Sequence, residues 1–159
     1  MRGKFTIVYQ RSHDIDWFAR NGKIMIHAMS FGGLLPASVN QWITNLNMMR
    51  KAYQLPISNI EVVYSDYAES MMREVNSEGD ERDREKYLRH FRDMAKRGFW
   101  SFDRDMHDEN LYHLIARPDG GFPDEILIPH LQELYDGEFG AEFFDRKVRD
   151  VSIVINRNI

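Results

Sequence analysis

The stretch Asp14–Pro36, DIDWFARNGKIMIHAMSFGGLLP, decides the predicted fold. Its centre, Arg20-Asn21-Gly22-Lys23, predicts the tight turn of a β-hairpin, because Asn-Gly tolerates the positive φ angles that a type I′ turn requires. The two arms of the hairpin are predicted at Asp16–Ala19 and Lys23–Met29. Both sets of alternating residues in the second arm are largely apolar, so we expect this strand to be covered on both faces and to lie inside the sheet.

The end of the same stretch predicts a turn into a long helix. Gly32-Gly33 suits a tight turn, and Pro36 suits a first helical position, where its missing N–H costs nothing. Apolar residues then recur at helical spacing, which predicts a helix from Pro36 to about Tyr53. The glycine pair lacks the spacing of a nucleotide-binding loop, so we interpret it as a structural turn.

Apolar patterns predict further elements on both sides of this stretch. The other predicted strands are Lys4–Gln10, Ile60–Tyr64, Leu111–Ala116, Glu125–Ile128 and Val148–Ile155. The other predicted helices are Tyr67–Val75, a helix from near Asp80 that ends before Gly98, and Pro129–Tyr135. This order predicts one α+β domain over residues 1–159. We expect a mixed, mostly antiparallel sheet of about five to seven strands, with two or three long amphipathic helices packed on one face.

The composition excludes several classes of protein. A chain of 159 residues that is 43% hydrophobic can form one domain with its own core. The absence of cysteine excludes a disulfide framework, a cysteine zinc site and a thiol nucleophile. We find no signal peptide and no apolar run near the roughly 18 residues of a membrane span. A net charge of −4 weighs against binding to nucleic acid. We therefore expect a cytoplasmic protein that binds neither membranes nor nucleic acid.

Two polar segments carry side chains that could bind a divalent metal. They are His13, Asp14 and Asp16 before the hairpin, and Asp103, Asp105 and His107 in a polar loop at 103–110. Carboxylates and imidazoles are common ligands of divalent metals. The second segment lacks the glycine and glutamate of an EF-hand loop, and each segment can also be interpreted as a solvated turn. The metal hypothesis therefore requires the two segments to meet in space.

His27 is the candidate catalytic residue. It lies among apolar residues of the second hairpin arm. It is either a buried neutral histidine held by hydrogen bonds or, if its face opens onto a cleft, a general base. Ser30 follows it but lacks the G-x-S-x-G pattern of a nucleophile, so we assign it no such role.

No catalytic motif in the sequence is complete, and two hypotheses for the function follow. The first is a non-enzymatic interaction or accessory protein that needs no cofactor and binds a protein partner or a second copy of itself. Its proposed interface is the aromatic segment with Phe99, Trp100 and Phe102. The alternative is a metal-dependent hydrolase acting on a phosphoester or similar anionic substrate, with a divalent metal held by the two polar segments and His27 as base. Whether the chain is an enzyme is left open by the sequence.

Overall fold

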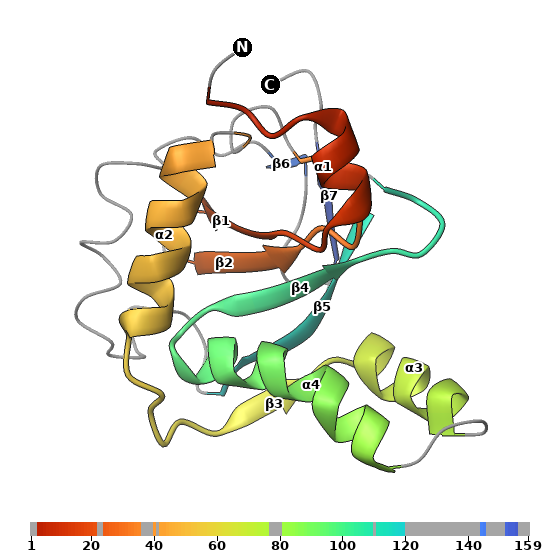
Figure 1. The fold of residues 1–159 in the computed structure, drawn as a ribbon. Helices are drawn as coiled ribbons and strands as arrows, with labels where there is room; N and C mark the ends of the chain where they lie inside the picture. Colours follow the sequence, from red (N-terminus) through yellow and green to blue (C-terminus); the bar gives the residue numbers. More distant parts are fainter. Residues whose placement is uncertain are drawn as a thin grey trace.

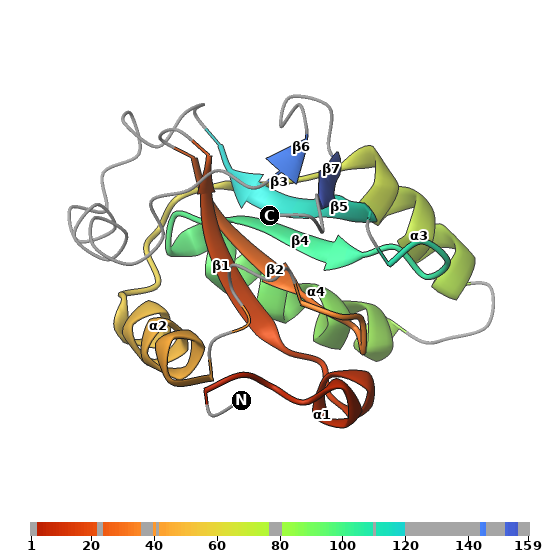
Figure 2. The same ribbon diagram turned by 90° about the horizontal axis from the view of Figure 1, so that it is seen from above.

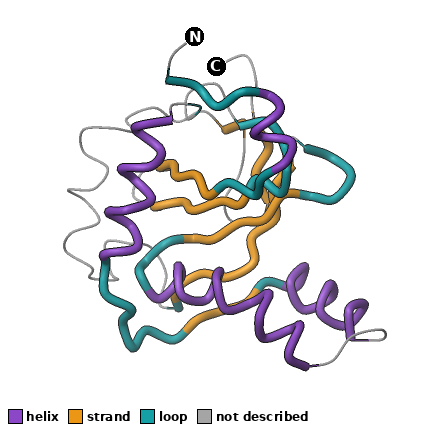
Figure 3. The backbone as a smooth tube through the Cα atoms, viewed as in Figure 1, coloured by secondary structure: helices purple, strands orange, loops and turns teal. Residues whose placement is uncertain are grey.

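The fold is α+β and is built around one mixed sheet (Figures 1 and 3). The computed structural model describes residues 3–21, 24–35, 40, 42–76, 81–109, 111–119, 144–145 and 152–155. The strands are β1 (Asp16–Asn21), β2 (Ile24–Met29), β3 (Val62–Tyr64), β4 (Trp100–Arg104), β5 (Leu111–Pro118), β6 (Phe144–Asp145) and β7 (Ser152–Ile155). The helices are α1 (Ile7–Ser12), α2 (Trp42–Gln54), α3 (Asp66–Asn76) and α4 (Glu81–Lys96). The predicted α+β class with a single mixed sheet is confirmed.

The hairpin lies at one edge of this sheet. β1 and β2 pair antiparallel from Asp16↔Met29 to Asn21↔Ile24, which confirms the predicted pairing of the two arms. Gly22 and Lys23 of the predicted turn lie outside the described residues. β2 also pairs in parallel with β4, so it lies inside the sheet as predicted. β4 pairs antiparallel with β5, whose other edge carries β7 at 111–113 and β3 at 116–118. The strand order is therefore β1-β2-β4-β5-β7-β6, with β3 beside β5.

Helices α2 and α4 lie on the same side of the sheet (Figure 2). α2 packs against β1, and α4 packs against β4 and β5. The antiparallel register places Phe18 and His27 opposite each other on one face, and Asp16 shares that face two residues away. The parallel register between β2 and β4 adds Ser101. The face covered by the helices therefore carries several polar side chains near the hairpin.

The opposite face of the hairpin holds part of the apolar core. Trp17, Ala28 and Phe102 lie there by register and are fully buried. The Trp17 ring meets the Tyr112 ring nearly edge-on, with centroids 5.3 Å apart. Burial on both faces explains why this part of the sheet is so rich in apolar residues. None of the helices that the structure describes has the length and apolarity to cross a membrane.

The prediction of a strand at Lys4–Gln10 is wrong, because helix α1 occupies most of that segment. The Thr6 side chain accepts a hydrogen bond from the Tyr9 amide and so caps the start of α1. Phe5 and Tyr9, four residues apart, both pack on Trp42, with ring centroids 4.6 and 5.0 Å away. This cap and this aromatic contact outweigh the strand preference of Ile7 and its neighbours.

Other boundaries also differ from the predictions. The segment at 99–104, interpreted as an aromatic cluster and the start of a loop, contains β4. Helix α2 begins at Trp42. Its predicted start, Pro36, lies outside the described residues, as do the predicted strand Glu125–Ile128 and helix Pro129–Tyr135. The short strand β6 was not predicted. The remaining described elements agree with the predicted ones in type, with ends that differ by a few residues.

Candidate metal centre

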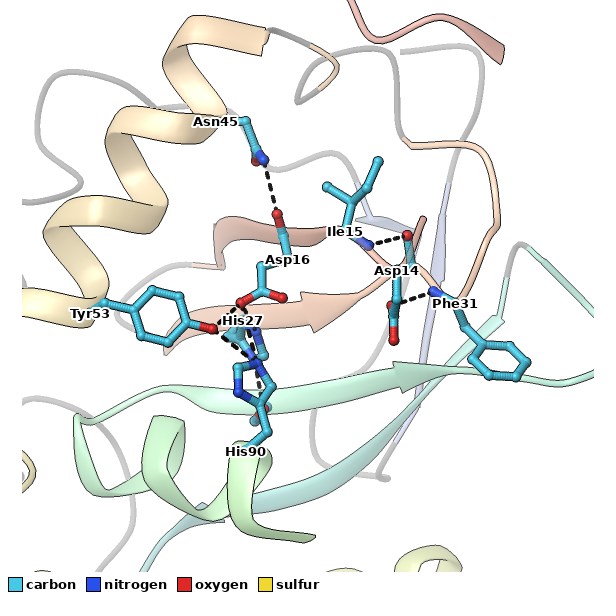
Figure 4. Close-up of polar contacts among 10 residues, drawn as sticks. Asp14, Ile15, Asp16, His27, Phe31, Asn45, Tyr53 and His90 are labelled. Atoms are coloured by element: carbon cyan, nitrogen blue, oxygen red, sulfur yellow. Dashed lines mark hydrogen bonds and ion pairs between the residues drawn. The ribbon is translucent and has the colours of Figure 1, made fainter. Parts of the chain in front are cut away.

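Asp16, His27, Tyr53 and His90 meet on the helix-covered face of the sheet and form what we term the Asp16 cluster (Figure 4). Asp16 opens β1, and His27 lies in β2 on the same face. Tyr53 comes from the last turn of α2, and His90 comes from α4. The fold thus brings the hairpin together with two helices that lie far from it and from each other in the sequence.

The oxygen Oδ2 of Asp16 is the centre of this cluster. The Tyr53 hydroxyl donates a hydrogen bond to it over 2.6 Å. His90 Nε2 lies 3.2 Å from the same oxygen, and His27 Nε2 lies 3.5 Å from it. Asn45 on α2 donates from Nδ2 to the backbone carbonyl of Asp16 over 3.0 Å. Helix α2 therefore holds both the main chain and the side chain of Asp16.

His27 is fully buried, and its two ring nitrogens have different surroundings. Nδ1 lies 2.7 Å from the Ser101 hydroxyl. Nε2 faces Asp16 but, within the part of the chain that the structure describes, makes no hydrogen bond of normal geometry. When Nδ1 carries the proton and donates it to Ser101, Nε2 turns a lone pair toward the Asp16 carboxylate. A cation bound between these two acceptors would satisfy both.

Asp16, His27 and His90 shift one another's pKa values. Burial alone would raise the pKa of Asp16, but the neighbouring imidazoles of His27 and His90, when protonated, outweigh it and hold that pKa well below its usual range. Burial lowers the pKa of His27, and Asp16 offsets only part of this effect. Burial also opposes charge on His90, but the pairing with Asp16 outweighs it and raises the pKa of His90. At neutral pH the site therefore holds an ionised carboxylate beside a neutral His27.

The spacing of the donor atoms suits one small metal ion. The donor atoms of Asp16, His27 and His90 all lie within 4.8 Å of one another. Donors placed about 2.0–2.1 Å from a metal at tetrahedral angles are roughly 3.3–3.4 Å apart, close to the observed 3.2 and 3.5 Å. Two imidazoles and one carboxylate form a donor set that zinc, iron and other transition metals accept. Among the described residues, this is the group of histidine and carboxylate side chains that meets the geometry.

One side of the cluster reaches the surface. The His90 side chain is 32% exposed and Tyr53 is 41% exposed, whereas Asp16 is 8% exposed. The cluster is therefore buried at the sheet, where His27 lies, and its exposed side chains are those of Tyr53 and His90, which form what we term its open side. A small molecule would approach the donor atoms from that open side.

Of the residues named from the sequence for metal binding or catalysis, Asp16 and His27 lie together in the cluster. Asp14 lies at its edge and accepts a hydrogen bond from the Phe31 amide over 2.8 Å. His13 is exposed, and its Nδ1 bonds to the Ser12 hydroxyl and the Tyr9 carbonyl, each at 2.9 Å. The structure therefore does not place His13 with Asp16, despite their closeness in sequence.

The second polar segment makes its own contacts. Tyr87 donates to Asp103 over 2.5 Å, and burial raises the pKa of Asp103 to about 6 although Tyr87 opposes this. Asp105 pairs with His113 at 2.8 Å and accepts a hydrogen bond from the His107 amide. The His107 side chain is exposed. The ion pair between Arg11 and Glu109 brings this loop near the segment before the hairpin. Asp103 and Asp105, however, pair with Tyr87 and His113 and not with the ligands proposed in that segment.

The aromatic segment proposed as an interface lies mostly inside the protein. Phe99 and Phe102 are fully buried, and Trp100 is 7% exposed. All three belong to the main hydrophobic core, and the Arg117 guanidinium covers the Trp100 ring at 5.5 Å. This segment therefore offers little free apolar surface to a partner.

Sequence reasoning missed Tyr53 and His90 as members of the site. Both fall at sheet-facing positions of amphipathic helices, where large or aromatic side chains are expected as core. His90 shares its helix face with Tyr87 and Met94, so one histidine at a core-facing position was the available signal. No single sequence can show that such a histidine faces Asp16 across the fold.

No known protein family, characterised protein or solved structure matches this chain. The geometry of the Asp16 cluster is therefore the evidence for a function.

Proposed function

We propose that this protein is a metal-dependent hydrolase whose divalent metal is held by Asp16, His27 and His90. The observation that carries the proposal is the fully buried Nε2 of His27, which lies 3.5 Å from the Asp16 carboxylate and, among the described residues, makes no hydrogen bond of normal geometry. A buried polar nitrogen without a partner costs free energy, which a metal ligated there would recover.

The surroundings of His27 match those of a metal ligand. A ligating histidine usually donates its other ring N–H to a protein acceptor, which sets the tautomer and the ring orientation. Ser101 supplies that acceptor at Nδ1. In this proposal His27 is a ligand and not the general base.

Three protein ligands leave the metal one open position, which is typical of catalytic zinc sites. The open side between Tyr53 and His90 is where water and substrate would enter. A metal-bound water has its pKa lowered to about 7, which gives a nucleophile at neutral pH. The proposed substrate class is a phosphoester or a similar anionic ester.

Calorimetric titration of the full chain with Zn²⁺, Mn²⁺ and Mg²⁺ tests the metal site. We expect one Zn²⁺ per chain, loss of this binding in His90→Asn, and retention in His107→Asn, which removes an exposed histidine outside the cluster. No binding by the native chain, or equal loss in both variants, would contradict the site.

Hydrolysis of nitrophenyl phosphate esters by the metal-loaded chain tests the proposed catalytic activity, and we expect Asp16→Asn to abolish it. If the metal-loaded chain cleaves no ester, the proposed hydrolase activity is contradicted.

The interaction role remains a second candidate because of one observation. Ile7 and Val8 on α1 are 65% and 78% exposed, and Ile43 on α2 is 68% exposed. Large apolar side chains at this exposure are common at protein interfaces. Size-exclusion chromatography with light scattering tests self-association, and a monomer at high concentration would count against that part.

A further inference from the structure

Tyr53 occupies the rim of the Asp16 cluster, with its ring partly in solvent and its hydroxyl inside. It is the most exposed member of the cluster at 41%, compared with 32% for the His90 side chain and none for His27. Its hydroxyl lies 2.6 Å from Asp16 Oδ2 and 3.3 Å from His90 Nε2. The hydroxyl is thus beside two of the three proposed metal ligands and on the open side.

Arg97 packs against the Tyr53 ring. The Arg97 guanidinium lies over the ring, 5.5 Å from its centroid. Arg97 is itself 9% exposed and donates from Nε to the Leu55 carbonyl over 3.1 Å. A donor fixed in this way costs little reorganisation when it binds a ligand.

A metal in this site would favour an anionic ligand beside Tyr53. A divalent ion bound by one carboxylate and two neutral imidazoles keeps one net positive charge, and Arg97 adds a second near the Tyr53 ring. The Asp14 carboxylate at the edge of the cluster offsets part of this charge. A phosphate group can place one oxygen on the metal and a second within reach of a neighbouring hydroxyl donor.

We infer that Tyr53 is a substrate-binding residue. When the metal takes Asp16 Oδ2, the Tyr53 hydroxyl gives up its hydrogen bond to that oxygen and donates its single proton instead to a phosphate-type oxyanion bound at the open position of the metal. This inference rests on the proposed metal centre and adds the group that recognises the substrate. The competing role for Tyr53 is to position Asp16, through the hydrogen bond that the hydroxyl makes to Oδ2.

Cobalt substitution separates these roles, because the visible absorption of Co²⁺ reports both metal binding and an added ligand. The full chain is loaded with Co²⁺ and titrated with inorganic phosphate in three forms: native, Tyr53→Phe and Tyr87→Phe. Tyr87 is a matched control, since its hydroxyl also donates to an aspartate, Asp103, outside the cluster.

We expect Tyr53→Phe to bind phosphate about tenfold more weakly, which corresponds to one lost hydrogen bond to an anion. Its Co²⁺ affinity should stay within a factor of about two of the native value, which also shows that the variant is folded. Tyr87→Phe should match the native chain in both affinities. An unchanged phosphate affinity in Tyr53→Phe overturns the inference, and a loss of Co²⁺ affinity alone assigns Tyr53 to the positioning of Asp16. A native chain that binds no Co²⁺ refutes the metal centre itself and this inference with it.

Discussion

His27 and His90 respond to pH in opposite directions in the metal-free chain. Burial lowers the pKa of His27, so the unfolded chain binds that proton more readily, and His27 costs stability as the pH falls below about 6.5. The pKa of His90 is raised by Asp16 against the effect of burial. Its contribution to stability is present below about pH 6.5 and is lost as the pH rises through its folded pKa.

Single variants should separate the two histidines. In His90→Asn, the free energy of unfolding should rise as the pH increases from below toward about 6.5, because His27 remains. In His27→Asn, the free energy of unfolding should fall as the pH rises above about 6.5, because His90 remains. Each slope is at most about 1.4 kcal/mol per pH unit for one proton. Urea unfolding with a chelator present, repeated across this pH range, measures both slopes. Other titrating groups, such as Asp103, are present in both variants and so do not account for a difference between them. Equal slopes would contradict the assigned pKa shifts.

Ser101 should matter for metal binding although it does not contact the metal. Ser101→Ala leaves Nδ1 of His27 without its partner, so we predict that Zn²⁺ affinity falls roughly 10- to 100-fold. Ser12→Ala is the matched control, because Ser12 makes a similar contact to Nδ1 of the exposed His13. Calorimetry on both variants measures the difference. A similar Zn²⁺ affinity in Ser101→Ala and Ser12→Ala would contradict the role given to Ser101.

Two members of the Asp16 cluster, Asp16 and His27, could be predicted from the sequence as site residues, but the contact between them could not. His27 is a candidate because a histidine is unusual among the apolar residues of a strand. Asp16 is a candidate because it lies near His13 in sequence. The structure places Asp16 on the same sheet face as His27, since the register pairs Phe18 with His27. Local sequence spacing therefore grouped Asp16 with His13, whereas the hairpin register groups it with His27.

Among the secondary-structure elements, α1 depends on a single side-chain cap. Thr6 accepts from the Tyr9 amide over 3.1 Å at the start of a helix of six residues. We predict that Thr6→Ala lowers the free energy of unfolding by about 1 kcal/mol, while Thr6→Ser stays close to native because it keeps the hydroxyl. Urea denaturation measures both, and equal loss in the two variants would contradict the capping role.

The spacing of apolar residues along the sequence predicted the elements in which that spacing is regular, such as the hairpin and the three longer helices. It failed at α1 and β4 for physical reasons. Phe5, Ile7 and Tyr9 alternate like the residues of a strand, and the aromatic contact with Trp42 that favours the helix comes from a distant segment. β4 alternates apolar and polar residues over Trp100–Asp103, but Phe99 before it and the charged residues after it give the segment the pattern of an aromatic cluster that runs into a polar loop.

In the whole molecule, the Asp16 cluster joins the hairpin to α2 and α4. A ligand that binds only this assembled arrangement stabilises the folded state by mass action. We predict that Zn²⁺ at 100 times its dissociation constant adds about 2.7 kcal/mol to the free energy of unfolding. For a domain of this length, that raises the melting temperature by roughly 5–10 °C. Asp16→Asn should show no such rise in differential scanning fluorimetry, and a rise equal to that of the native chain would contradict Asp16 as a ligand.

Anomalous diffraction from crystals of the full chain grown with Zn²⁺ tests the central claim most directly. We predict one strong peak at the zinc edge, about 2.0–2.1 Å from Asp16 Oδ2, His27 Nε2 and His90 Nε2. The Tyr53 hydroxyl should lie beside the remaining position. A peak at His13 or His107 with none in the Asp16 cluster, or a cluster closed by direct hydrogen bonds without metal at saturating Zn²⁺, would contradict the account.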